Sequence, residues 1–491
     1  MNPLKKLASQ TAVYGLSSIV GRLLNYLLVP LHTRVFLPEQ YGVVTEMYSY
    51  VAFLLIVLTY GFETAFFRFA GKEYEANKVY STAQSSLLSS SFLFVAICWL
   101  LSDSIASLIR YPEHPEYIVW FALILAFDAV TAIPFTRLRL ENKAFRFAGL
   151  KLVNIGVNVA ANLYFLWFCP YVISQPDSLF YELAQASYNP EIGVGYVFFS
   201  NLLASFITLV LLLPAMIRNG LSTDLQLWKR MLRYGFPLLI GGLAGITNEM
   251  FSRVSMKYQL NPDVAMHELG VFGACYKVAV LMTIFIQTFR FAAEPFFFAQ
   301  SGEKDSKKLY SMVMTWFVIA CSFIYLFVLL FMNIIRHFIG PQYYEGLGVV
   351  PVLLMASLFL GIFYNLSIWF KLKDKTVYGA WLAIFGAVLT ILLNYLLIPE
   401  YGYYGASWAT FIVYFSMMLL SYFLGKKYFP VPYEIGKIVL YPLGVAILAF
   451  VYSEFMPMEG MISWIMKSLI IAAFAAIVYL TEVRKKRLIS P

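Results

Sequence analysis

Long apolar stretches recur along the whole chain and are separated by short polar segments. Spans of about 18 or more mostly apolar residues are typical of transmembrane helices, because about 20 residues are needed to cross the hydrocarbon core. The fold class is therefore predicted to be an all-α polytopic membrane protein. We expect about fourteen transmembrane helices, at 9–36, 41–70, 80–109, 116–138, 145–169, 191–217, 231–259, 268–300, 308–335, 343–371, 376–398, 403–425, 435–454 and 461–483.

Composition agrees with this pattern and excludes several classes of protein. Of the 491 residues, 60% are hydrophobic and 13% are charged, whereas a soluble chain carries about 25% charged residues. The four cysteines form no CxxC pair, so neither a disulfide framework nor a metal site is indicated, and no cofactor is expected. No P-loop motif occurs, and the longest external loop, 171–191, is too short for a catalytic domain. The chain is not expected to be an enzyme.

The distribution of positive charge predicts the orientation. Most of the 36 lysines and arginines fall on the side of the membrane that holds the N-terminus. Because cytoplasmic loops are enriched in these residues, both termini are predicted to be cytoplasmic. The same bias accounts for the net charge of +9, so no nucleic-acid partner is expected.

Short similar segments recur in the same order in the two halves of the chain. A duplicated unit of six helices has an even number of crossings, so both copies have the same orientation, as parallel repeats do. We therefore predict an N-lobe at 1–220, a C-lobe at 221–430, and helices 13 and 14 with a cytoplasmic tail at 431–491. The matching pairs are YGLSSIVG (14–21) with YGFPLLIG (234–241), YGVVTEMY (41–48) with LGVFGACY (269–276), and KVYS (78–81) with KLYS (308–311).

Charged residues inside the predicted helices are the candidate functional groups. A charge at membrane depth costs several kcal/mol unless it faces a cavity or a partner, so such residues are functional candidates by default. Some are spaced i,i+4 and can neutralise each other on one helix face. The acidic candidates are either sites of ion coupling or counter-ions of the basic ones. The basic candidates are Arg22, Arg253, Lys277 and Arg290, and the acidic ones are Glu63, Asp128, Glu249 and Glu294.

Two segments carry a resemblance to a known family. SSIVGRLLNYLLVPLHTRVFLPEQYGVV (17–44) and LLNYLLIPEYGYYGASWAT (392–410) resemble the Wzx-type O-antigen or repeat-unit flippases of the MOP exporter superfamily, which are related to MurJ and to MATE transporters. The resemblance implies a V-shaped pair of lobes around a central cavity. It implies alternating access that moves an undecaprenyl-diphosphate-linked oligosaccharide from the inner to the outer leaflet of the cytoplasmic membrane. Membrane lipid, a polysaccharide polymerase and glycosyltransferases are the partners that such a role implies.

The resemblance also assigns a role to the basic candidates. In this family, helices 1, 2, 7 and 8 line the cleft between the lobes. A diphosphate carries about two negative charges, and the planar guanidinium group suits it well. Arg22 matches an arginine of the family's first helix, and Arg22, Arg253, Lys277 and Arg290 are therefore predicted to bind the diphosphate.

Two other functions stay open at this point. An ion-coupled drug antiporter of the same superfamily is the alternative, but a site for cations is expected to be acidic on balance. A polysaccharide polymerase or ligase needs a large external loop with arginines or histidines, and loop 171–191 contains neither.

Overall fold

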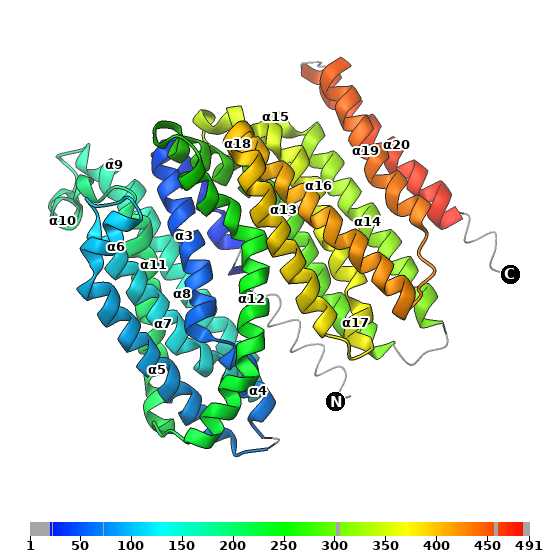
Figure 1. Ribbon diagram of the computed structural model, residues 1–491. Coiled ribbons are helices and arrows are strands. Elements are labelled where there is room, and N and C mark those ends of the chain that lie inside the picture. Colours follow the sequence, from blue (N-terminus) through cyan, green and yellow to red (C-terminus); the bar gives the residue numbers. More distant parts are fainter. Residues whose placement is uncertain (1–19, 22, 72, 301–304, 456–459, 485–491) are drawn as a thin grey trace. The chain divides into compact units, whose positions relative to one another are not determined.

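The computed structural model describes residues 20–484 except for 22, 72, 301–304 and 456–459 (Figure 1). Regular structure in these ranges is helical, apart from one isolated bridge between Ala70 and Tyr74. The chain divides into two compact units, Met1–Gly273 and Ala274–Pro491, and each is described by itself below. The predicted all-helical class is confirmed. The lobe boundaries at 220 and 430 stay a prediction that rests on the sequence repeats.

The described residues of the first unit form five long helices and several short ones before α12. Their bounds are α2 Val29–Val35, α3 Pro38–Thr59, α4 Phe62–Phe69, α5 Ala76–Leu100, α6 Ser102–Leu108, α7 Pro115–Leu140, α8 Ala144–Leu163, η1 Tyr164–Phe168, α9 Cys169–Ile173, α10 Tyr181–Ser187, η2 Pro190–Ile192, α11 Gly195–Asn219 and α12 Leu225–Gln259. α13, Pro262–Ala299, begins in this unit and continues into the second.

Close packing at the break between α3 and α4 brings α12 into the first unit. Tyr60 and Gly61 adopt positive φ angles of 34° and 75°, a backbone conformation that glycine adopts without steric cost. A Cβ on Gly235 of α12 would lie 2.5 Å from the Tyr60 carbonyl oxygen, so only glycine allows this approach. Leu227 and Met231 of α12 are then fully buried against the core of this unit.

Aromatic and aliphatic side chains from α4, α5 and α7 form that core with α12. Phe62, Phe66, Tyr80, Leu87 and Ile133 are fully buried in it. α11 packs against both α7 and α8. The start of α12 is capped by Asp224, whose carboxylate accepts a hydrogen bond from the Leu227 amide and pairs with Lys78 at 2.6 Å. Such an N-cap satisfies a backbone donor that the first turn leaves free.

The second unit is built on α13, α14, α16 and the long α18. Its remaining bounds are α14 Ser306–Leu330, α15 Met332–Ile335, η3 Arg336–Phe338, η4 Pro341–Val349, α16 Val350–Leu366, α17 Ile368–Leu372, α18 Val377–Tyr428, α19 Ile435–Phe455, α20 Gly460–Val478 and η5 Tyr479–Arg484. α16 packs along α18, and α14 packs against α16 and α19.

α18 contains two of the predicted helices. It covers the ranges predicted at 376–398 and 403–425, and the only non-helical residue inside it is Gly402, with φ 53° and ψ −131°. Pro399 lies three residues earlier, and a proline interrupts the helical hydrogen bonds. The predicted boundary between helices 11 and 12 is thus present as a kink.

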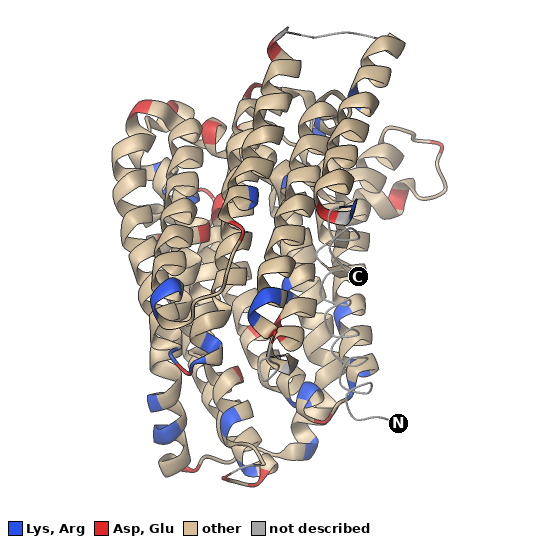
Figure 2. Cartoon of the chain, turned by 90° about the vertical axis from the view of Figure 1, so that its right-hand side faces the viewer, with Lys and Arg blue, Asp and Glu red and all other residues tan. Residues whose placement is uncertain are grey.

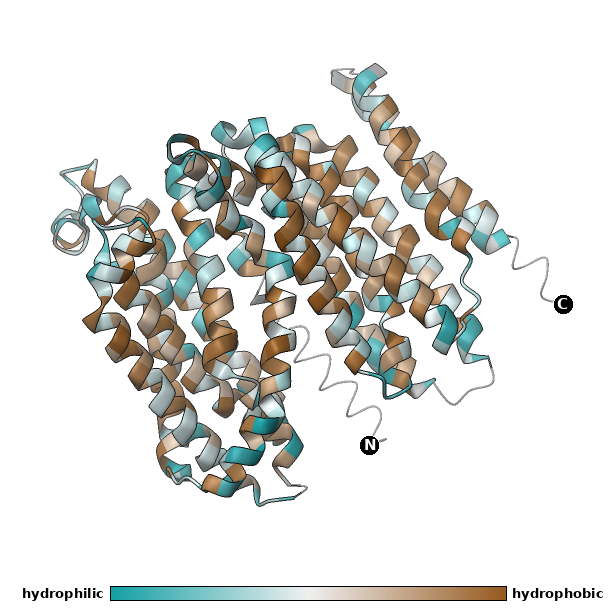
Figure 3. Ribbon diagram, in the orientation of Figure 1, coloured by the Kyte–Doolittle hydropathy of each residue, from teal (hydrophilic) through white to brown (hydrophobic). Residues whose placement is uncertain are grey.

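Eleven helices among the described residues are long and apolar enough to cross a membrane. α12 is more polar than these, and most of the helix predicted at 9–36 lies outside the described residues. Figure 3 shows hydrophobic residues along the length of the helices and hydrophilic residues at many of their ends. Figure 2 shows Lys and Arg concentrated toward the lower ends of the helices. A multi-pass membrane protein is therefore confirmed.

Candidate functional site

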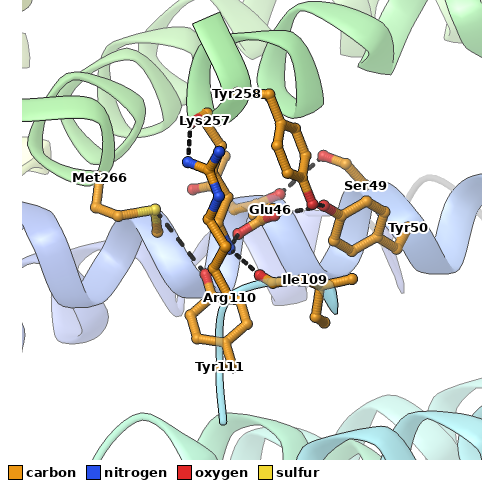
Figure 4. A network of polar contacts seen from close by, with 10 residues as sticks. Glu46, Ser49, Tyr50, Ile109, Arg110, Tyr111, Lys257, Tyr258 and Met266 are labelled. Atoms are coloured by element: carbon orange, nitrogen blue, oxygen red, sulfur yellow. Dashed lines mark hydrogen bonds and ion pairs between the residues drawn. The ribbon is translucent and has the colours of Figure 1, made fainter. Parts of the chain in front are cut away.

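A buried ion pair joins α3 to α12 in the first unit (Figure 4). The side chains of Glu46 and Lys257 are 0% and 5% exposed, and Lys257 Nζ lies 2.8 Å from Glu46 Oε2. Lys257 also donates a hydrogen bond to the Ile109 carbonyl at 2.6 Å. Burying two charges is expensive unless they are paired and further hydrogen-bonded, and both conditions are met here.

Tyrosines complete the hydrogen bonds of the Glu46 carboxylate. Tyr50 donates to Oε1 and Tyr111 to Oε2, both at 2.5 Å, and the hydroxyls of Tyr50 and Tyr258 lie 2.9 Å apart. The Lys257 ammonium also lies 3.6 Å from the centre of the Tyr111 ring. Burial and the Glu46 carboxylate raise the pKa of Tyr111, so its hydroxyl stays protonated and remains a donor. We call these five residues the Glu46 network.

A polar cavity of about 460 Å³ lies elsewhere in the first unit, among α3, α4, α7, α8 and α11. Asp128 is thirteen residues into α7, or about 20 Å along a helix that rises 1.5 Å per residue. The cavity therefore reaches well into the membrane-spanning part of the unit. The charged and amide side chains that line it are Glu63, Asp128, Arg139, Lys151, Asn154 and Asn201.

The four charged groups of this cavity are not paired as the Glu46 network is. Within the described parts of the chain, none of them forms an ion pair within 4.0 Å. Asp128 Oδ1 accepts a hydrogen bond from Ser205 at 2.8 Å. Lys151 and Arg139 line the same cavity as Glu63 and Asp128. The charges balance across the cavity without direct contact.

Aromatic rings support the two bases of the cavity. The Lys151 ammonium lies 4.2 Å from the centre of the Phe135 ring, and the Arg139 guanidinium lies 5.2 Å from the centre of Phe67. A cation over an aromatic face gains about 0.5–2 kcal/mol, which holds the base in place while its donors stay available. We call this site the Asp128 cavity.

A third group of charges belongs to the second unit. Glu294 of α13 accepts from Arg290 on the same helix and from Lys371 of α17, both at 2.7 Å. Arg290 also lies 4.7 Å from the centre of the Tyr364 ring. All three charged side chains are partly exposed. The i,i+4 ion pair between Arg290 and Glu294, one of the alternatives considered from the sequence, is therefore present. Lys371 forms a second ion pair with the same carboxylate.

The remaining predicted residues lie in several places. Arg253 is buried on α12 and donates to the Glu249 carbonyl oxygen at 2.9 Å. The Glu249 side chain is exposed and forms no ion pair with a described residue. Lys277 is exposed on α13, and Arg22 lies outside the described residues. The structure therefore does not test whether these four basic residues bind one diphosphate, and this role stays a prediction.

The sequence reasoning missed four charged residues that the structure places in the Glu46 network and the Asp128 cavity. Glu46, Arg139, Lys151 and Lys257 lie near the predicted helix ends, where charges are ordinary. The sequence relates one pair of them. Glu46, near the start of the helix predicted at 41–70, and Lys257, near the end of the helix predicted at 231–259, both fall at the predicted outer side of the membrane. No motif marks the others.

Comparison with known proteins identifies the family. The sequence model described as "Polysaccharide biosynthesis protein" matches residues 7–301, and no curated protein sequence matches. Among solved structures, the lipid II flippase MurJ in an inward closed conformation is 13% identical with a TM-score of 0.71, and the alignment covers 97% of this chain and 99% of that one.

Transporters of a related kind share the fold as well. An inward-facing multidrug resistance MATE family transporter of the MOP superfamily is 15% identical with a TM-score of 0.61, over 85% of this chain and 94% of that one. A MATE transporter in complex with MaD3S is 16% identical with a TM-score of 0.57, over 87% and 96%. The chain thus has the fold of the MOP superfamily, as the resemblance predicted, and it belongs to the polysaccharide biosynthesis protein family.

Proposed function

We propose that this protein moves an undecaprenyl-diphosphate-linked oligosaccharide from the inner to the outer leaflet of the bacterial cytoplasmic membrane, for surface polysaccharide assembly. The observation that carries the proposal is the match to the polysaccharide biosynthesis family in a chain with a MurJ-like fold. The proposed transport makes and breaks no covalent bond. It consists of alternating access to a polar path through an otherwise apolar membrane.

The charged residues of the membrane helices suit the parts of such a substrate. We propose that Arg22, Arg253, Lys277 and Arg290 bind the diphosphate, since arginine offers paired donors to phosphate oxygens. Arg290 already holds a carboxylate, Glu294, and a diphosphate would compete for the same donors. We propose Glu249 and Glu294 as counter-ions, while Glu63 and Asp128 face the bases of the Asp128 cavity and serve there as counter-ions or in ion coupling.

The proposed setting follows from the charge bias along the sequence. Both termini are placed in the cytoplasm, where lipid-linked saccharides are assembled, and the external ends of the helices face the compartment that receives them. Glycosyltransferases would act before the transport step, and a polysaccharide polymerase would act after it.

The second candidate is an ion-coupled drug antiporter, because MATE transporters share the fold. A site for organic cations is expected to carry excess negative charge. The Asp128 cavity instead holds two bases and two acids, Glu63, Asp128, Arg139 and Lys151. This balance favours a neutral polar group over a cation.

A transport assay separates the two candidates. Purified protein in liposomes would be given a fluorescent undecaprenyl-diphosphate oligosaccharide, and its exposure at the outer leaflet would be followed against protein-free liposomes. We expect exposure to rise faster with the protein present. Transport of a cationic dye down an ion gradient, without movement of the lipid-linked saccharide, would overturn the proposal in favour of the antiporter.

A further inference from the structure

We infer that the Asp128 cavity binds sugar rings of the transported head group. This inference rests on the proposed function and names the part of the substrate that the first unit recognises. The cavity volume of about 460 Å³ falls within the range of about 300–1,000 Å³ that is usual for small-ligand sites. It suits a few sugar rings rather than an entire lipid-linked molecule.

The polar lining offers the donors and acceptors that sugar hydroxyls require. Each hydroxyl donates one hydrogen bond and accepts others, so planar amides and carboxylates are well matched to adjacent hydroxyl pairs. Asn154 donates to Thr208 at 2.9 Å, and Ser205 donates to Asp128 Oδ1. These contacts fix the orientation of the Asn154 amide and of the Asp128 carboxylate, whose other oxygen, Oδ2, accepts no hydrogen bond from a described residue.

The Lys151 ammonium adds donors that the protein leaves available. It donates no hydrogen bond to a described residue, and it is held over the Phe135 ring. A charged side chain that faces a cavity without a direct ion pair keeps its donors available for a ligand. Hydrogen bonds from a charged donor are worth about 1.5–3 kcal/mol, so a hydroxyl that meets Lys151 would gain more than one that meets water.

Apolar surface is present beside these polar groups. Phe135 and Phe147 both line the cavity, and their rings meet edge to face with centroids 5.4 Å apart. Sugar rings combine polar edges with C–H faces that pack on aromatic surface. Polar groups at fixed positions next to an aromatic wall are usual for ligand pockets of mixed character.

Other occupants fit the cavity less well. The lining holds two acids and two bases, so a bound ion of either sign would leave the site with an uncompensated charge. No group of three or more His, Cys, Asp or Glu residues is placed to hold a metal ion among the described residues. A lipid tail would leave the polar side chains without partners, and buried polar groups without partners are costly. A neutral, hydroxyl-rich ligand satisfies all of these groups together.

The test compares binding of the parts of the substrate. The probes are undecaprenyl diphosphate, the same lipid carrying the host cell's oligosaccharide, and that oligosaccharide released in free form. The variants are Asn154→Leu and Lys151→Met. The matched control is Lys143→Met, which removes an exposed lysine that pairs with Glu141 outside the cavity.

We expect both cavity variants to bind the free and the lipid-linked oligosaccharide at least tenfold more weakly than the wild type. Their affinity for undecaprenyl diphosphate should be unchanged, and Lys143→Met should behave as the wild type. Wild-type affinity of both variants for the oligosaccharide would overturn the inference and leave the proposed function intact. Equal loss of all three ligands would overturn it too, since a saccharide site does not hold the diphosphate.

A wild-type protein that binds no lipid-linked probe would overturn the proposed function itself, and the inference with it. A second measurement does not depend on the folding of those variants. Ser205→Cys places a thiol at the cavity, and the free oligosaccharide should slow its labelling by a small maleimide at least fivefold. Labelling at the same rate with and without the oligosaccharide would contradict the inference.

Discussion

The Glu46 network and the Asp128 cavity lie in the same unit, and both place acids and bases on membrane-spanning helices. In the Glu46 network every charged group meets its partner directly, with Lys257 and two tyrosines on one carboxylate. In the Asp128 cavity, Glu63 and Lys151 both line the cavity and make no ion pair with each other. The two sites use the same types of charged residue. They differ in how many of the hydrogen bonds and ion pairs of these residues are supplied by the protein itself.

This difference separates two uses of charge inside a membrane protein. A buried pair whose hydrogen bonds are complete has no capacity left for a ligand, and its role is to fix how α3 and α12 pack. Charges that face a cavity leave donors and acceptors for something else. The default reading that intramembrane charge is functional therefore applies to Lys151 and not to Lys257, although neither residue has a carboxylate beside it in sequence.

The largest effect is expected from Lys257→Met. The substitution leaves the Glu46 carboxylate buried without its counter-ion, and breaking a buried pair costs about 3–5 kcal/mol. The free energy of unfolding in detergent, measured with a denaturant, would report this loss. The double variant Glu46→Gln with Lys257→Met should recover much of it, because no uncompensated charge remains. A single variant as stable as the wild type would contradict the assigned structural role.

A smaller loss is expected from Tyr111→Phe. The change removes one hydrogen bond to the Glu46 carboxylate, and bonds to charged groups are worth about 1.5–3 kcal/mol. Tyr50→Phe is the matched comparison, since Tyr50 donates to the other oxygen but also meets Tyr258. Both variants should unfold at lower denaturant concentration than the wild type. If neither variant shifts the midpoint of unfolding, the hydrogen bonds from the two tyrosines to Glu46 do not contribute to stability.

Lys151→Met is expected to change stability by at most about 2 kcal/mol, because the lysine forms no ion pair with a described residue and its contact with Phe135 is worth about 0.5–2 kcal/mol. Transport of the lipid-linked oligosaccharide should nevertheless fall about tenfold. The same purified sample serves both measurements, so misfolding is excluded directly. A loss of stability as large as that of Lys257→Met would show that the two sites do not differ in the way proposed.

The smallest effect on stability is expected from Glu294→Gln in the second unit. Its partners Arg290 and Lys371 are partly exposed, and exposed ion pairs contribute about 0–1 kcal/mol. Raising the salt concentration should reduce the difference from the wild type further, which unfolding at two ionic strengths would show. A loss of several kcal/mol that does not depend on salt would show that Arg290, Glu294 and Lys371 stabilise the protein as the buried Glu46 network does.

The hydrophobic pattern predicts most helices closely, because membrane thickness imposes length and apolarity on each of them. α7 was expected at 116–138 and is found at Pro115–Leu140. The hydrophobic pattern does not predict local breaks and kinks of the backbone. The break at Tyr60 and Gly61 divides a predicted single helix, and Gly402 is a kink where two helices were predicted.

The candidate site was predictable only in part. Asp128 and Glu63 were identified because they interrupt apolar stretches, and Arg290 with Glu294 because of their spacing. The partner of Glu46 is 211 positions away, and only the predicted depth that Glu46 and Lys257 share relates them in the sequence. Lys151 is not marked by the sequence, because it lies one or two turns from a helix end that is predicted to be cytoplasmic, where lysine is ordinary. Burial and pairing depend on which helices become neighbours, and hydropathy carries no such information.

The most direct test of the account measures stability and transport together for Lys257→Met and Lys151→Met. Each variant would be assayed for its unfolding midpoint in denaturant and for the rate at which a lipid-linked oligosaccharide becomes exposed at the outer leaflet of liposomes. We expect Lys257→Met to lose about 3–5 kcal/mol of stability, whereas Lys151→Met loses at most about 2 kcal/mol and its transport rate falls about tenfold. Retained transport in a fully stable Lys151→Met protein would contradict the account.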